Sequence, residues 1–143
     1  MSSSKSPPSG LAIVVCDQII EDKATGKKSL IGIFNNITSP TFPCRHPSIS
    51  VYLSMTEGHG SYQMRLRIIN EETGGAIAEV QGQLPFPDKN FVAELAINFV
   101  GLEFPAPGLY SIELYCDESL VLERRFHVIK VNPPAKGPPA AEL

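Results

Sequence analysis

The chain has 143 residues, with 12 lysines and arginines, 15 aspartates and glutamates, and a formal net charge of −3. This length fits one domain, which can bury enough apolar surface to fold without a metal or a disulfide framework. The charges are dispersed with no basic stripe, so we expect no nucleic-acid partner. No apolar run reaches about 18 residues, so we expect no transmembrane helix and no membrane partner.

The cysteines suggest a reducing compartment. Cys16, Cys44 and Cys116 are an odd number without paired spacing, which argues against a disulfide framework. The N-terminus carries no hydrophobic signal region. We therefore predict reduced thiols and a cytoplasmic protein.

Both ends of the chain differ in composition from the middle. Residues 1–10 are rich in Ser, Pro and Lys, and residues 132–143 in Pro, Ala and Gly. Such segments bury too little apolar surface to offset the entropy lost on ordering. We predict a flexible N-terminal tail at 1–10, one domain at 11–131 and a flexible C-terminal tail at 132–143.

The domain opens with two apolar runs at 11–20 and 29–37, joined across a turn that contains Thr25 and Gly26. Their many β-branched residues favour strands over short buried helices. Because the runs are almost continuously apolar, we expect a strand pair that is covered on both faces.

Two runs with strict alternation follow, at 49–55 and 62–68, separated by a four-residue turn with two glycines at 57–60. The alternation predicts a hairpin in which Met55 pairs with Tyr62 and Ile49 with Ile68, so that every apolar residue meets another. The opposite face would then be polar and solvated. It consists of Ser50, Tyr52, Ser54, Gln63, Arg65 and Arg67.

This polar face is the candidate interaction site. In the predicted register Tyr52 lies opposite Arg65, and the two side chains could stack. Tyrosine and arginine are also common anchors of protein interfaces. The alternative is an ordinary solvated sheet face.

Further strands are predicted at 76–84 and 91–99, on either side of a loop that contains two prolines. A Pro-Gly corner at 104–110 leads to Tyr110, whose hydroxyl could bond upstream backbone as in a tyrosine corner. A last hairpin joins 109–116 to 120–131. Arg124 occupies one of the alternate positions of the second strand that are otherwise apolar, which indicates a bulge or an arginine whose stem is packed.

Eight short strands separated by turn signals predict an all-β protein, an antiparallel immunoglobulin-like β-sandwich. A jelly roll or a C2-like sandwich is the alternative.

The opening segment also resembles a known family. Cys16-Asp17, Asp22, Thr25-Gly26-Lys27 and the run 29–34 are similar to the start of a family of small uncharacterised bacterial proteins. The run 51–53, the turn at 58–60 and the corner at 107–110 are similar as well. The resemblance covers residues 11–131 and implies a β-sandwich, but it brings no activity.

The residues suggest no catalytic or cofactor chemistry. The segment 25–29 lacks the upstream glycine and the contiguous Gly-Lys-Ser/Thr of a phosphate loop. Cys44, His46 and His59 supply only one closely spaced pair of zinc ligands. Carboxylates in the loops near 17–22 and 117–118 could hold calcium only if the two loops shared one end of a C2-like sandwich.

We therefore expect a non-enzymatic module without cofactor or metal, whose partner is another protein. The alternative is a small-ligand or carbohydrate-binding module. Its loops would be 36–47, 57–60 and 85–90 at one end of the sandwich.

Overall fold

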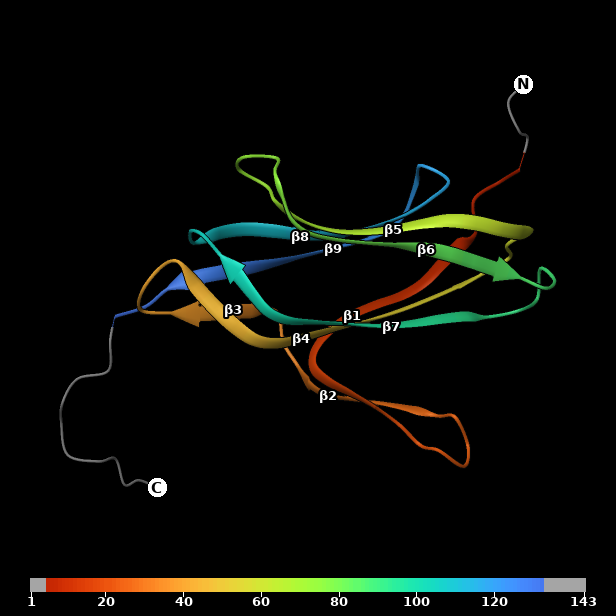
Figure 1. Ribbon diagram of the computed structural model, residues 1–143, viewed down its shortest axis with the longest axis horizontal. Helices are drawn as coiled ribbons and strands as arrows, with labels where there is room; N and C mark the ends of the chain where they lie inside the picture. Colours follow the sequence, from red (N-terminus) through yellow and green to blue (C-terminus); the bar gives the residue numbers. More distant parts are fainter. Residues whose placement is uncertain (1–4, 133–143) are drawn as a thin grey trace.

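The computed structural model describes residues 5–132, and these form nine strands in two sheets that pack face to face (Figure 1). Sheet A has the strand order β2-β1-β4-β7, and sheet B has the order β3-β9-β8-β5-β6. The strands are β1 (Ser9–Glu21), β2 (Lys28–Ile33), β3 (Asn36–Ser39), β4 (Cys44–Thr56), β5 (Gly60–Asn70), β6 (Ala76–Phe86), β7 (Ala93–Phe104), β8 (Gly108–Cys116) and β9 (Ser119–Lys130).

The strand order is that of an immunoglobulin-like sandwich. In chain order β1, β4 and β7 take the places of strands A, B and E, and β5, β8 and β9 those of C, F and G. β6 extends the second sheet beside β5, as strand C′ does. The predicted fold class is confirmed. The predicted strand at 29–37 is interrupted, because β2 ends in sheet A and β3 pairs parallel with β9 in sheet B.

The core lies between the two sheets and is built from alternate residues. The alternation predicted for β4 and β5 is confirmed, because the same apolar set of each strand is buried. These residues are Ile49, Val51, Leu53, Met55, Tyr62, Met64, Leu66 and Ile68.

The predicted hairpin between 49–55 and 62–68 is wrong. β4 pairs with β1 and β7 in sheet A, whereas β5 pairs with β6 and β8 in sheet B. The turn at 57–60 therefore crosses from one sheet to the other. Alternation shows which face of each strand is buried. It does not show whether two such strands lie side by side in one sheet or face each other from opposite sheets, because both arrangements bring the apolar sets together.

The corner before β8 is a tyrosine corner, as predicted. The Tyr110 hydroxyl donates a hydrogen bond to the backbone oxygen of Ala106 at 2.7 Å. The ring is fully buried, and its centroid lies 5.1 Å from that of Phe104 and 6.0 Å from that of Phe126. This contact fixes the entry of the chain into β8.

The last hairpin contains the predicted bulge, between Leu114 and Tyr115. Arg124 lies across from Ile112 and is half-buried. Its guanidinium donates to the backbone oxygen of Ile13 at 3.3 Å and to Asn35 Oδ1 at 2.6 Å. The arginine therefore tethers the segment after β2 to β9.

Residues 17–33, which we call the flap, leave the body of sheet A. β1 pairs with β4 only as far as Cys16, and beyond it β1 pairs only with β2. The flap turns back beneath the outer face of β4 and β7 (Figure 1), where Lys28 Nζ lies 3.2 Å from Glu94 Oε1. The expectation that this strand pair is covered on both faces is wrong, because Ile33 of β2 is 58% exposed.

Glycine is required where the flap begins to diverge. Gly32 has a φ of +74°, and a Cβ added there would lie 2.4 Å from Asp17 Oδ2. Both the backbone conformation and the close approach of Asp17 exclude a side chain.

The domain begins earlier than predicted. β1 starts at Ser9, and Lys5 and Ser6 of the predicted 1–10 tail contact β5 and its neighbours. The predicted tail at 132–143 lies outside the described residues except for its first position. In the part of the chain that the structure describes, no helix is long and apolar enough to cross a membrane.

Candidate functional site

The six residues of the predicted interaction face lie on opposite sides of the molecule. Tyr52 is paired with Val14 and Ala96 in sheet A, and Arg65 is paired with Gln81 and Tyr115 in sheet B. Tyr52 and Arg65 therefore do not face each other. Ser50, Tyr52 and Ser54 belong to the outer face of sheet A, and Gln63, Arg65 and Arg67 to the outer face of sheet B.

The outer face of sheet B is polar and open, and none of the described strands packs against it (Figure 1). The Arg65 guanidinium lies 5.0 Å from the centre of the Tyr115 ring, a cation–π contact. The Tyr115 hydroxyl donates to Glu113 Oε1 at 2.9 Å, and Arg67 Nε lies 3.6 Å from Glu79 Oε1. This face therefore carries arginine and carboxylate side chains next to each other.

A shallow depression of about 650 Å³ lies beside Arg65, at the end of this face near the β8–β9 turn. Gln63 and Arg65 were predicted from the sequence, but their neighbours from β6 and the β8–β9 turn were not, because only the strand order places them beside each other. The lining residues are Gln63, Arg65, Gln81, Asp117 and Glu118.

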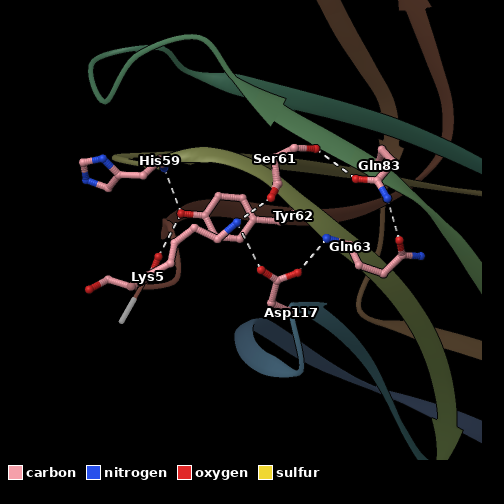
Figure 2. A network of polar contacts seen from close by, with 8 residues as sticks. Lys5, His59, Ser61, Tyr62, Gln63, Gln83 and Asp117 are labelled. Carbon is pink, nitrogen blue, oxygen red and sulfur yellow. Dashed lines mark hydrogen bonds and ion pairs between the residues drawn. The ribbon is translucent and has the colours of Figure 1, made fainter. Parts of the chain in front are cut away.

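The edge of this depression is held by a polar network that includes the N-terminal segment (Figure 2). Asp117 Oδ1 accepts a hydrogen bond from the Gln63 backbone N–H at 2.8 Å, and its Oδ2 lies 3.3 Å from Lys5 Nζ. The Lys5 ammonium also lies 4.1 Å from the centre of the Tyr62 ring. The backbone hydrogen bond, supported by Lys5, holds the pKa of Asp117 below its usual value. Asp117 is therefore an anion at neutral pH.

Tyr62 joins that network to the loop before β5. Its hydroxyl accepts from the His59 backbone N–H at 2.8 Å and donates to the Ser6 backbone oxygen at 2.8 Å. The ring itself is buried in the core. Residues 5 and 6 are thereby fixed across the end of the sandwich.

The outer face of sheet A is partly covered by the flap. A polar contact joins the tip of the flap to the sheet: the Tyr52 hydroxyl donates to Glu94 Oε2, and Lys28 Nζ lies 3.2 Å from Glu94 Oε1. We call Lys28, Tyr52 and Glu94 the latch. The hydrogen bond from Tyr52, assisted by Lys28, lowers the pKa of Glu94. Burial, and then the bond to Glu94, raises the pKa of Tyr52, so the pair is a neutral phenol on a carboxylate at neutral pH.

Between the flap and the sheet lies a cleft of about 540 Å³, which we call the flap cleft. Ser48 and Ser50 both donate to Asn98 Oδ1 at 2.9 Å within it. Ser50 is only 4% exposed although it points away from the core. The cleft is lined by Asp17, Gln18, Ile19, Ser48, Ser50, Ala96, Ile97 and Asn98.

The three loops considered for ligand binding do not share one end of the sandwich. The loops at 57–60 and 85–90 lie together, because the Glu57 backbone N–H donates to the Lys89 oxygen at 3.0 Å. The segment 36–47 comprises β3 and the start of β4, at the opposite end of β4 from Thr56. An end-on site built from all three is therefore ruled out.

The potential metal ligands are dispersed. Cys44 and His46 lie at the start of β4, whereas His59 follows the far end of that strand. Over residues 5–132 no group of three or more histidine, cysteine or acidic side chains is arranged to hold a metal ion. All three cysteines are free and buried.

Strand order and tyrosine corner define an immunoglobulin-like β-sandwich protein with one open polar face and one face partly covered by a hairpin. The chain belongs to the family of unknown function DUF6941, whose model matches residues 11–129. The predicted resemblance to an uncharacterised family is confirmed at that level.

None of the curated proteins matches this sequence. Among solved structures, the chain is similar to the crystal structure of an immunoglobulin-like protein from Pseudomonas aeruginosa, with 9% identity and a TM-score of 0.45. That similarity covers 88% of this chain and 99% of the other, and it is too distant to indicate a function.

Proposed function

We propose that this protein is a non-enzymatic binding module that uses the outer face of sheet B to bind another protein. The observation that carries the proposal is the stacked Arg65–Tyr115 pair on an open face beside a depression. Arginine and tyrosine provide large contact areas, and they dominate the binding energy of many interfaces.

The size of this face supports the proposal. Four strands spaced by about 4.8 Å and about ten residues long span about 600 Å² in projection, before the side chains protrude. Each partner in an interface of standard size contributes about 800 Å². Because protruding side chains add to the projected area, the outer face of sheet B is comparable in size to one side of a standard interface.

The charges on this face support a protein partner over a nucleic acid. Arg67 lies beside Glu79, and Glu113 lies between Arg67 and Glu123 in the sheet. A phosphate backbone requires a surface of one sign. A face that carries charges of both signs instead suits a partner with a complementary pattern, which sets orientation and specificity.

The test is affinity purification of chemically cross-linked complexes, followed by mass spectrometry, with three forms of the protein. Arg65→Ala removes the stacked cation, and Arg45→Ala is the matched control, because Arg45 lies exposed on sheet A. We expect one reproducible partner that the wild type and Arg45→Ala both retain. We expect Arg65→Ala to lose that partner while its thermal unfolding stays near that of the wild type. Equal recovery with all three forms would reject this face as the binding site.

We further propose that the protein acts in the bacterial cytoplasm. Three free, buried cysteines fit a compartment in which thiols stay reduced. Fractionation of native cells with an antibody against the protein tests this. Recovery in a periplasmic or membrane fraction would contradict it.

A further inference from the structure

The flap cleft, on the opposite side of the molecule from the proposed protein-binding face, has the features of a small-molecule site. Its volume of about 540 Å³ falls within the range of about 300–1,000 Å³ that is usual for ligand pockets. It lies where β1 leaves β4 after Cys16, so one wall is the sheet and the other is the start of the flap.

Asn98 is held in one orientation in this cleft. Its Oδ1 accepts hydrogen bonds from both Ser48 and Ser50, each at 2.9 Å. Two acceptor positions of that oxygen are thereby used, and the amide nitrogen is turned the other way with its two N–H donors. Among residues 5–132, no side chain or backbone group accepts a hydrogen bond from this nitrogen. A ligand oxygen could therefore bind there without breaking an existing contact.

The charge of the lining limits the ligand class. Asp17 is the one charged residue among the eight that line the cleft, and no cation lines it. A phosphate or carboxylate would meet this acidic group without compensation, so anions are disfavoured. The remaining polar groups are amides and hydroxyls, which both donate and accept.

The apolar part of the lining is also small. Ile19 belongs to the flap and Ala96 to the outer face of β7, so aliphatic carbon lies next to the amide and hydroxyl groups, whereas the Ile97 side chain packs against the core. A ligand that fits must therefore present C–H surface and several hydroxyl groups together. Sugars and related polyols have this character.

We infer that the flap cleft binds a neutral polyhydroxylated ligand of the size of a mono- or disaccharide. The Asn98 amide nitrogen donates to one ligand oxygen, and the Asp17 carboxylate accepts from a ligand hydroxyl. The C–H surface of the ligand packs against the side chains of Ala96 and Ile19. The latch closes the far end of the flap over this cleft.

The test is a titration of the isotope-labelled full chain followed by the backbone amide signals. The probes are glucose, galactose, N-acetylglucosamine and maltose at millimolar concentrations, with glucose 6-phosphate and putrescine as anionic and cationic comparators. We expect at least one neutral sugar to shift the signals of 17–19, 48–50 and 96–98, and to shift them more than either comparator.

Two variants make the test specific. Asn98→Leu removes the amide donors, and we expect it to weaken sugar binding at least about tenfold, or about 1.4 kcal/mol. Asn90→Leu makes the same change on an exposed side chain in the loop before β7, outside the cleft, and is expected to bind sugar like the wild type. If Asn98→Leu does not fold, Ser50→Ala, which frees Asn98 to rotate, is expected to weaken binding in the same direction.

The inference is overturned if no neutral sugar shifts the cleft signals, or if only a charged comparator does. It is also overturned if Asn98→Leu folds and binds sugar like the wild type. None of these results depends on the outcome for the outer face of sheet B.

Discussion

At the scale of single residues, the clearest determinant of this fold is Tyr110. It is fully buried, and yet its hydroxyl has a partner, the Ala106 backbone oxygen at 2.7 Å. A buried hydroxyl without such a bond would be costly, so the corner and the tyrosine stabilise each other.

We expect Tyr110→Phe to lower the free energy of unfolding by about 1–2 kcal/mol, because the bond is lost while the ring remains packed. The measurement is urea unfolding at equilibrium. Tyr115→Phe is the control, since the Tyr115 hydroxyl lies on the outer face of sheet B and, among residues 5–132, hydrogen-bonds only Glu113. We expect it to lower the free energy of unfolding by less than about 0.5 kcal/mol. Equal effects of the two variants would contradict the role assigned to the corner.

The cysteines give a second prediction at this scale. Burial raises the pKa of all three thiols, and that of Cys116 to about 11. We expect a thiol reagent at pH 8 to leave the native protein unmodified and to label three thiols after denaturation. Rapid labelling of the native form would show that the sandwich opens readily.

The same thiols make stability depend on pH. An unfolded cysteine ionises near a pKa of about 8.5. Cys116 binds its proton more tightly in the folded state. Its contribution to the free energy of unfolding is therefore complete below the unfolded pKa and is lost as the pH rises toward the folded pKa of about 11. We expect the free energy of unfolding to fall over this interval, and Cys116→Ala to reduce the slope.

At the scale of elements, the flap is the part of the molecule with the least support. It pairs with the rest of sheet A only up to Cys16, and its tip is joined to β7 by the latch. Few buried contacts and many exposed backbone hydrogen bonds predict a low free energy of local opening. The flap can therefore open without unfolding the sandwich.

We expect Lys28→Met to speed hydrogen exchange of the backbone amides in 17–33 and to leave those of β5 and β8 unchanged. The substitution keeps the stem of the side chain but removes the charge that holds Glu94. Exchange of the native protein measured by NMR checks this, with Lys23→Met in the turn as the control. Uniform acceleration in both sheets would instead indicate that the latch supports the whole domain.

At the scale of the whole molecule, the two outer faces are separate surfaces. Tyr52 on sheet A and Arg65 on sheet B lie on opposite sides of the core, with no shared partner among the residues described. Distant sites contribute to stability independently. The sandwich thus offers two surfaces that can be altered one at a time.

We expect the effects of Tyr52→Ala and Arg65→Ala on the free energy of unfolding to be additive. The change in the double variant should lie within about 0.5 kcal/mol of the sum of the two single changes. Urea unfolding of the wild type, both single variants and the double variant provides the cycle. A coupling above about 1 kcal/mol would favour the hairpin that the sequence predicts, in which the two side chains are in contact.

Much of the fold followed from the sequence because its signals are local. Alternation along 49–55 and 62–68 identified the buried side of each strand, and the Pro-Gly corner identified Tyr110. Arg124 among apolar residues indicated either a bulge or a packed arginine stem, and the hairpin has a bulge while Arg124 is half-buried. The candidate site was found only in part, because Tyr115, Gln81 and Asn98 carry no signal of their own until the strand order is known.

The sequence by itself determined which residues of β4 and β5 face the core, where the chain turns and that the protein is an all-β sandwich. Side-chain alternation and turn propensities act over a few residues, so one strand is enough to reveal them. Only the tertiary structure decided that β4 and β5 belong to different sheets and that the flap lies beneath sheet A. Strand partners are joined by hydrogen bonds between backbones that any sequence can form, and the choice among them depends on how the whole core is filled.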